Sequence, residues 1–155
     1  AVVSVLSNVG KVHGLHVVVE SGPVTIMVGS TSGAQDYVEE TELGTGVHSL
    51  AFTLATLNLY VRFQSRLDRI VLVDSCEFEA AGNLEVATPW AATDIDNVRT
   101  DQSGDIVYVA CAGKQQYKIE RRSTTGWSVV KYEPDDGPFR IANTGTMTMT
   151  PIVPP

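Results

Sequence analysis

Short segments in which apolar and polar side chains alternate, each bounded by a turn signal, dominate this chain. In "NLYVRFQ" (58–64), the residues predicted to point inward are Leu59, Val61 and Phe63. In "VHSLAFTL" (47–54), the more apolar side carries His48, Leu50, Phe52 and Leu54. A period of two is typical of β-strands, and we find no window with a sustained helical period. The alternation therefore predicts an all-β protein.

Residues 1–86 are predicted to form a jelly-roll-like β-sandwich. "HVVVE" and "VTIMVG" flank Ser21-Gly22-Pro23, which predicts a hairpin or a short connection between two strands. Residues 29–46 are rich in Gly, Ser and Thr and are predicted to be mostly loop. "RIVLVDSCEFE" predicts one further strand. Short strands separated by turns at this spacing favour a sandwich.

Residues 87–150 are predicted to form an antiparallel β-meander that resembles a propeller blade. Pro89 interrupts the strand pattern, and "AATDID" predicts one short helical turn capped by Thr93. "GDIVYVAC", "QQYKIERR" and "GWSVVKYE" then predict three consecutive strands. An isolated three-stranded meander is marginal in water, so we expect this half to pack on something else. Residues 151–155 form a Pro-rich tail, and the chain is expected to be a fragment of a longer polypeptide.

The net charge of −7 is concentrated in the first half of the chain. Residues 1–86 hold 4 basic and 10 acidic side chains. Because nucleic-acid affinity depends on Lys and Arg that neutralise phosphates, we expect no sequence-specific nucleic-acid partner. No apolar run is long enough to cross a membrane. We therefore expect no membrane partner.

The sequence predicts no catalytic residue, no cofactor and no metal site. His13 and His16 are three apart in a strand, so they point to opposite faces and cannot chelate one ion. His48 falls on an apolar face, which favours a hydrogen-bonded structural role. Cys76 and Cys111 are predicted to be free, buried thiols. Residues 94–105 lack the Gly and Glu of an EF-hand, although another kind of calcium loop stays an alternative.

Four aromatic residues are candidates for contacts. Tyr37, in the long loop, and Tyr60, on an outer strand face, are candidate glycan contacts, because sugar rings stack on exposed aromatic side chains. Covering the rim of the sandwich is the alternative role for both. Trp90 and Trp127 are predicted to be packing anchors between the two halves.

Residues 88–139 resemble a segment of tail and head–tail connector proteins of tailed bacteriophages and prophages. The matching motifs are Thr88-Pro89-Trp90, Asp94-Ile95-Asp96, Gln102-Ser103-Gly104-Asp105, Gly126-Trp127-Ser128 and Asp136-Gly137-Pro138-Phe139. Residues 110–113 depart from the usual "H-P" ending of the apolar strand. The first half resembles galactose-binding-like jelly-roll modules in "VTIMVGSTSGAQDY" and "GTGVHSLAFT".

The resemblance implies a structural virion protein of the short tail, of the nozzle or connector type, with no catalytic residues. Such a protein is assembled in the cytoplasm of the bacterial host and resides in the virion tail. Its partners would be other tail subunits in a homo-oligomeric ring. The alternative is a carbohydrate-binding module for adsorption to a host glycan. A glycoside hydrolase, the third class, would need two carboxylates facing each other across a groove.

Overall fold

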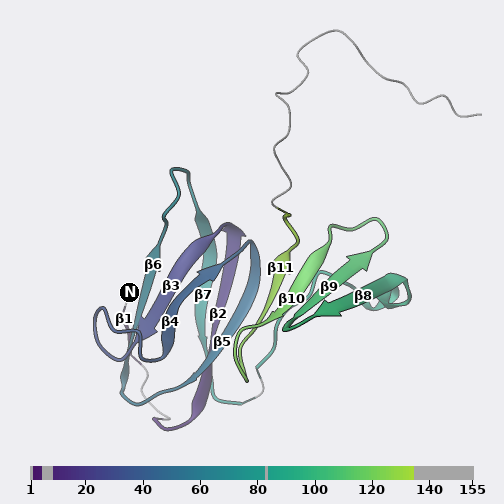
Figure 1. Ribbon diagram of the computed structural model, residues 1–155. Helices are drawn as coiled ribbons and strands as arrows, with labels where there is room; N and C mark the ends of the chain where they lie inside the picture. Colours follow the sequence, from purple (N-terminus) through teal and green to yellow (C-terminus); the bar gives the residue numbers. More distant parts are fainter. Residues whose placement is uncertain (1, 5–8, 83, 135–155) are drawn as a thin grey trace, which may run out of the picture.

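The computed structural model describes residues 2–4, 9–82 and 84–134, and these form two antiparallel sheets. The smaller sheet has the order β1-β6-β3-β4. Its strands are β1 (Val2–Ser4), β6 (Asn58–Gln64), β3 (Val24–Gly29) and β4 (Val38–Leu43). The sheets pack face to face, which confirms the predicted β-sandwich (Figure 1).

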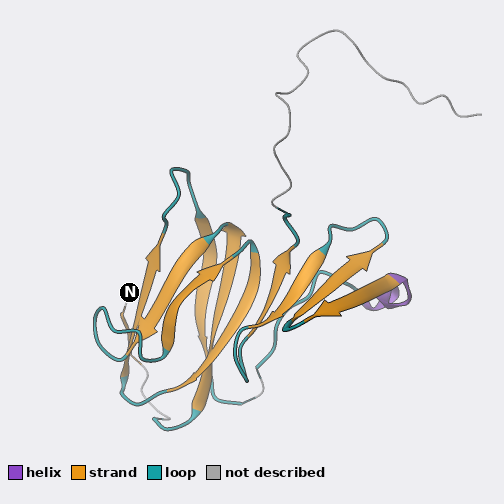
Figure 2. Cartoon of the chain, in the orientation of Figure 1, coloured by secondary structure: helices purple, strands orange, loops and turns teal. Residues whose placement is uncertain are grey.

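The larger sheet has the order β7-β2-β5-β11-β10-β9-β8. Its strands are β7 (Leu72–Glu79), β2 (Val12–Ser21), β5 (Gly46–Thr53), β11 (Trp127–Lys131), β10 (Tyr117–Arg121), β9 (Ile106–Cys111) and β8 (Val98–Ser103). A short 3-10 helix, η1 (Ala92–Asn97), precedes β8 (Figure 2). The Ser21-Gly22-Pro23 segment connects β2 to β3 and so crosses from one sheet to the other, rather than closing a hairpin.

The core lies between strands β2 and β5 of the large sheet on one side and the small sheet on the other. Its largest fully buried apolar side chains come from both sheets and include Leu15, Ile26, Leu43 and Leu59. The alternation in β5 is confirmed, since His48, Leu50 and Phe52 are buried. Leu59 and Val61 of β6 are buried as predicted, but Phe63 is 36% exposed. Because β1 pairs with β6 only at residues 58–60, Phe63 lacks a described strand on that flank.

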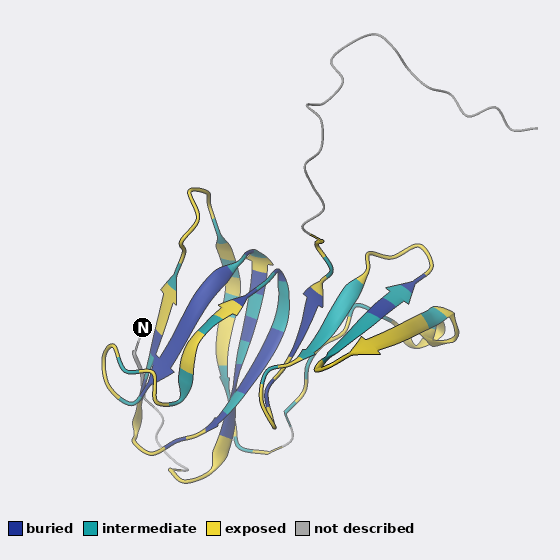
Figure 3. Cartoon of the chain, in the orientation of Figure 1, coloured by how far each residue is buried: buried dark blue, intermediate teal, exposed yellow. Residues whose placement is uncertain are grey.

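The predicted meander β9-β10-β11 is confirmed, and it continues the sandwich's own sheet. β11 pairs with β5 from Trp127↔Ser49 to Val130↔Gly46. In Figure 1 the strands β11, β10, β9 and β8 fan out to one side of the two packed sheets. This pairing satisfies the expectation that the meander needs a second element to support it. It also leaves one side of β8–β10 uncovered by the small sheet (Figure 3).

Three strands escape the sequence prediction, β1, β4 and β8. All three are edge strands, β1 and β4 in the small sheet and β8 in the large one. β8 is exposed at every residue except Val98, and β4 lies within the segment that was predicted to be mostly loop. An edge strand forms backbone hydrogen bonds on one side and needs little apolar surface, so its sequence looks like a loop.

The helical turn begins earlier than predicted. Its N-cap is Ala91, not Thr93. The carboxylate of Asp94 accepts the Ala91 N–H at 2.8 Å and also pairs with Lys114 Nζ at 2.7 Å. The hydrogen bond and ion pair with Lys114 hold the pKa of Asp94 below its usual value. The N-terminus of the turn is therefore stabilised by the third residue rather than by a capping hydroxyl.

Candidate interaction surfaces

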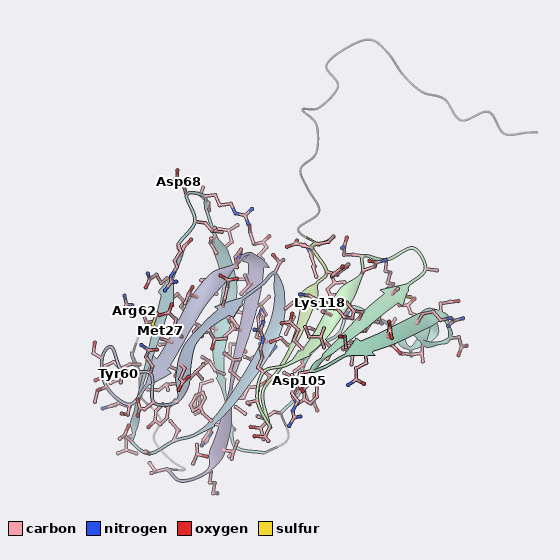
Figure 4. The ribbon with its side chains drawn as sticks, in the orientation of Figure 1. Met27, Tyr60, Arg62, Asp68, Asp105 and Lys118 are labelled. Carbon is pink, nitrogen blue, oxygen red and sulfur yellow. The ribbon has the colours of Figure 1, made fainter. Side chains whose placement is uncertain are left out.

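The connection between β6 and β7, residues 65–71, projects beyond both sheets. Figure 4 shows Asp68 at its end. Ile70 is 80% exposed, Leu67 is 40% exposed, and Leu72 at the start of β7 is 47% exposed. We call these three side chains the apolar tip. Exposed apolar groups that gather on one projection are unusual on an isolated soluble protein and are typical of a contact surface.

Two arginines attach this projection to the body of the protein. Arg69 Nη2 donates to the carbonyl oxygen of Gly22 at 2.7 Å, and Arg66 forms an ion pair with Glu40. The first contact is to the β2–β3 connection and the second is to β4. The apolar tip is thus presented from a loop that is tied to β4 and to the connection between the two sheets, which lowers the ordering cost of a contact made through it.

A line of polar side chains crosses from β5 to β10 on the inner side of the large sheet. His48 Nε2 lies 2.9 Å from the Gly44 carbonyl oxygen, and because a carbonyl only accepts, Nε2 carries the proton. His48 Nδ1 then accepts the Ser128 hydroxyl at 2.8 Å, and Arg122 Nε donates to the same oxygen at 3.3 Å. Glu120 pairs with Arg122 at 2.5 Å and with Lys118 at 2.9 Å.

This line is structural. His48 and Ser128 have no exposed surface, so no substrate reaches the hydroxyl. Burial lowers the pKa of His48 to about 4, which keeps the imidazole neutral near pH 7. The predicted structural role of His48 is confirmed by its two hydrogen bonds. The line joins the meander to the sandwich across the β5–β11 pair.

The two tyrosines named from the sequence do not lie together. Tyr37 stacks on Phe52 with ring centroids 5.4 Å apart, and its hydroxyl accepts the N–H groups of Ala55 and Thr56 at 2.9 and 3.2 Å. Its ring and its hydroxyl are therefore both used inside the protein. Tyr60 lies on the outer side of the small sheet, near Arg62, beside a shallow hollow (Figure 4).

The two tryptophans lie on the outer side of the large sheet. Trp90 packs edge-on against Tyr117 of β10, with ring centroids 5.8 Å apart. Trp127 opens β11 opposite Ser49 and is 40% exposed. Leu84 and Val86, from the segment that connects the two halves, border the same hollow as Trp127. That segment also explains why Ser49, predicted to be on the non-core face, is 2% exposed.

The remaining candidates are dispersed. His13 pairs with Phe52 and His16 with Ser49, so the two histidines lie on opposite faces as predicted. Cys111 is buried, whereas Cys76 is exposed because it lies on the edge strand β7, so the prediction of two buried thiols is wrong for Cys76. No group of three or more His, Cys, Asp or Glu side chains suited to a metal ion occurs among residues 2–4, 9–82 and 84–134. Within the same ranges, no helix is long and apolar enough to span a membrane.

The inner side of the meander also carries an aromatic hollow of about 290 Å³. Tyr108 of β9 and Tyr132, just after β11, meet edge to face at 5.6 Å between ring centroids. The signal in the sequence was the alternation of each strand, which assigns each tyrosine to a face. Only the strand order brings the two rings together.

Comparisons of the sequence with known protein families and with curated proteins, and of the fold with solved structures, find no significant match.

Proposed function

We propose that this chain is a non-enzymatic structural module of a bacteriophage or prophage tail, of the nozzle or connector type. It acts by contacts with neighbouring subunits, and the apolar tip is the observation that carries the proposal. The phage motifs at residues 88–134 support the choice of partner. The last motif, Asp136-Gly137-Pro138-Phe139, lies outside the described residues.

A head-to-tail ring needs two different patches on opposite sides of each subunit. The apolar tip adjoins β7, one edge of the large sheet. At the other edge, η1 leads into β8, and Ile95 of η1 is 61% exposed. Among the described residues, the large sheet thus carries exposed apolar side chains at both of its ends. In the proposed ring the apolar tip of one subunit contacts the η1 end of the next.

The test is to replace Ile70 by Asp in the protein's native gene context. Since Ile70 is 80% exposed, the thermal midpoint of the purified chain should change little. Incorporation into tails isolated on a density gradient should fall at least about tenfold, because a charge would be buried in an apolar contact. Thr124→Asp, in the exposed β10–β11 turn, is the matched control and should assemble normally. Tails with normal amounts of the Ile70→Asp protein would refute the proposal.

A further inference from the structure

The aromatic hollow lies on a side of the large sheet that the core side chains also occupy. Cross-strand register shows this directly. Tyr108 lies opposite Lys118, Lys118 opposite Val130, and Val130 opposite Gly46. Gly46 in turn pairs with Val19, a core residue. The hollow is therefore where the sandwich core would continue if the small sheet extended over β8–β10.

The shape of the aromatic hollow depends on one small side chain, that of Ala110. Ala110 of β9 lies opposite Arg99 of β8, and it leaves space between longer neighbours. Tyr132 is held beside it, since its N–H donates to the Gln116 carbonyl oxygen at 2.9 Å and its own carbonyl accepts Gln115 Nε2 at 3.2 Å. Asp101, directly opposite Tyr108, closes the β8 side. The aromatic pair and these polar groups thus border one depression.

The chemistry of the lining favours an uncharged ligand. Arg99 Nη1 donates to the carbonyl oxygens of Asp96 and Val98 at 2.9 and 2.8 Å, so it is tied to η1 and to the start of β8. Lys118, the next cation on this face, is paired with Glu120 at 2.9 Å. Asp101 adds a negative charge. An anion such as phosphate would meet this carboxylate and find both cations engaged.

A sugar ring is uncharged and offers both an apolar face and hydroxyl groups, which suit the aromatic and polar parts of this lining. Its C–H faces pack on aromatic rings, and its hydroxyls pair with carboxylate and amide groups at the rim. The volume of about 290 Å³ lies at the lower end of the range for small-molecule sites. A single pyranose with one linked neighbour outside the hollow matches that size.

We propose that this hollow binds a neutral pyranose unit of a glycan, with Tyr108 as the stacking platform and Asp101 and Gln116 as hydroxyl partners. Sequence patterns named Tyr37 and Tyr60 for glycan contact, so this site is a different one. It does not depend on the assembly role of the apolar tip, which lies at the other edge of the large sheet.

The experiment is a titration of the isotope-labelled 155-residue chain, followed by amide NMR shifts. The probes are the methyl glycosides of glucose, galactose, mannose and N-acetylglucosamine, and separately inorganic phosphate. Concentrations reach about 50 mM, so dissociation constants well above about 1 mM are still detected. At least one glycoside should give saturable shifts confined to residues around Ala110, Gln116 and Tyr132.

Three variants locate the binding. Tyr108→Ala should weaken it at least about tenfold, as loss of a stacked ring does. Asp101→Ala should weaken it several-fold and, since Asp101 is exposed, keeps the fold even where the Tyr108 variant does not. Tyr60→Ala is the matched control and should leave the binding constant unchanged. No saturable shift with any glycoside, binding lost only in Tyr60→Ala, or phosphate binding in the hollow would each overturn the proposal.

Discussion

Acidification should destabilise this protein through His48. In the folded state burial lowers the pKa of His48 to about 4, from an ordinary value of 6.5. The unfolded chain therefore takes up a proton at higher pH than the folded chain does. The stabilisation from a neutral, buried imidazole is complete above about pH 6.5 and is lost as the pH falls toward 4.

The size of the effect follows from the two pKa values. Each pH unit between 6.5 and about 4 corresponds to about 1.4 kcal/mol, so the free energy of unfolding should drop by about 3 kcal/mol over the window. Besides burial, the charges of Arg122 and His16 lower the pKa of His48, whereas the Gly44 carbonyl and Glu120 raise it. His48 is fully buried in the structure, so solvent does little to screen these contributions.

Urea unfolding at about pH 7 and at about pH 4 measures this, with His48→Gln as the reference protein. Acidic side chains elsewhere also titrate in the window, and they do so in both proteins. The difference in unfolding free energy between the two proteins therefore isolates His48, and it should shrink by about 3 kcal/mol on acidification. An NMR titration of the His48 ring supplies a direct check. A midpoint near 6.5 in the folded protein, or a difference that does not change with pH, would refute the reasoning.

Three other substitutions test the fold by urea unfolding, two of them as a matched pair of glycine variants. Gly46→Ala should cost at least about 3 kcal/mol, because Gly46 has a φ of +151° and an added Cβ would collide with the backbone of Val129. Gly33→Ala should cost only about 1–2 kcal/mol, because Gly33 has a φ of +87° but open space around it. Equal losses of unfolding free energy in the two variants would contradict the argument. Tyr37→Phe should cost about 1 kcal/mol and speed hydrogen exchange at the amides of Ala55 and Thr56, whose acceptor is lost, whereas unchanged exchange would show that the hydroxyl is not their partner.

The sequence predicted most of the strands that have a buried face. Alternation is imposed by burial, so it is clearest in β5 and β6, which pack on the core. Phe63 shows the limit of the pattern, since its place in the alternation matches Leu59 and Val61 but the described pairing of β6 with β1 covers only residues 58–60. Three edge strands were missed, β1, β4 and β8. For β4 and β8 the reason is that an edge needs backbone pairing on one side only, and polar sequences provide it equally well.

Some features of the candidate surfaces could likewise be predicted from the sequence, and others could not. The absence of recognisable catalytic motifs, the buried role of His48 and the opposite faces of His13 and His16 all follow from residue type and the two-residue period of a strand. The attachment of Arg69 to Gly22 does not, because these residues are 47 apart in the sequence and meet only through the packing of two sheets.

What the sequence determined by itself is therefore local: which segments are extended, and which side of each is apolar. Tertiary structure decided which strands became neighbours. The pairing of β11 with β5 placed Ser128 beside His48, and the order β11-β10-β9-β8 placed Tyr132 near Tyr108. The physical reason is that any two complementary strands can share backbone hydrogen bonds. Strand order is selected by the burial of the whole core, which no short stretch of sequence encodes.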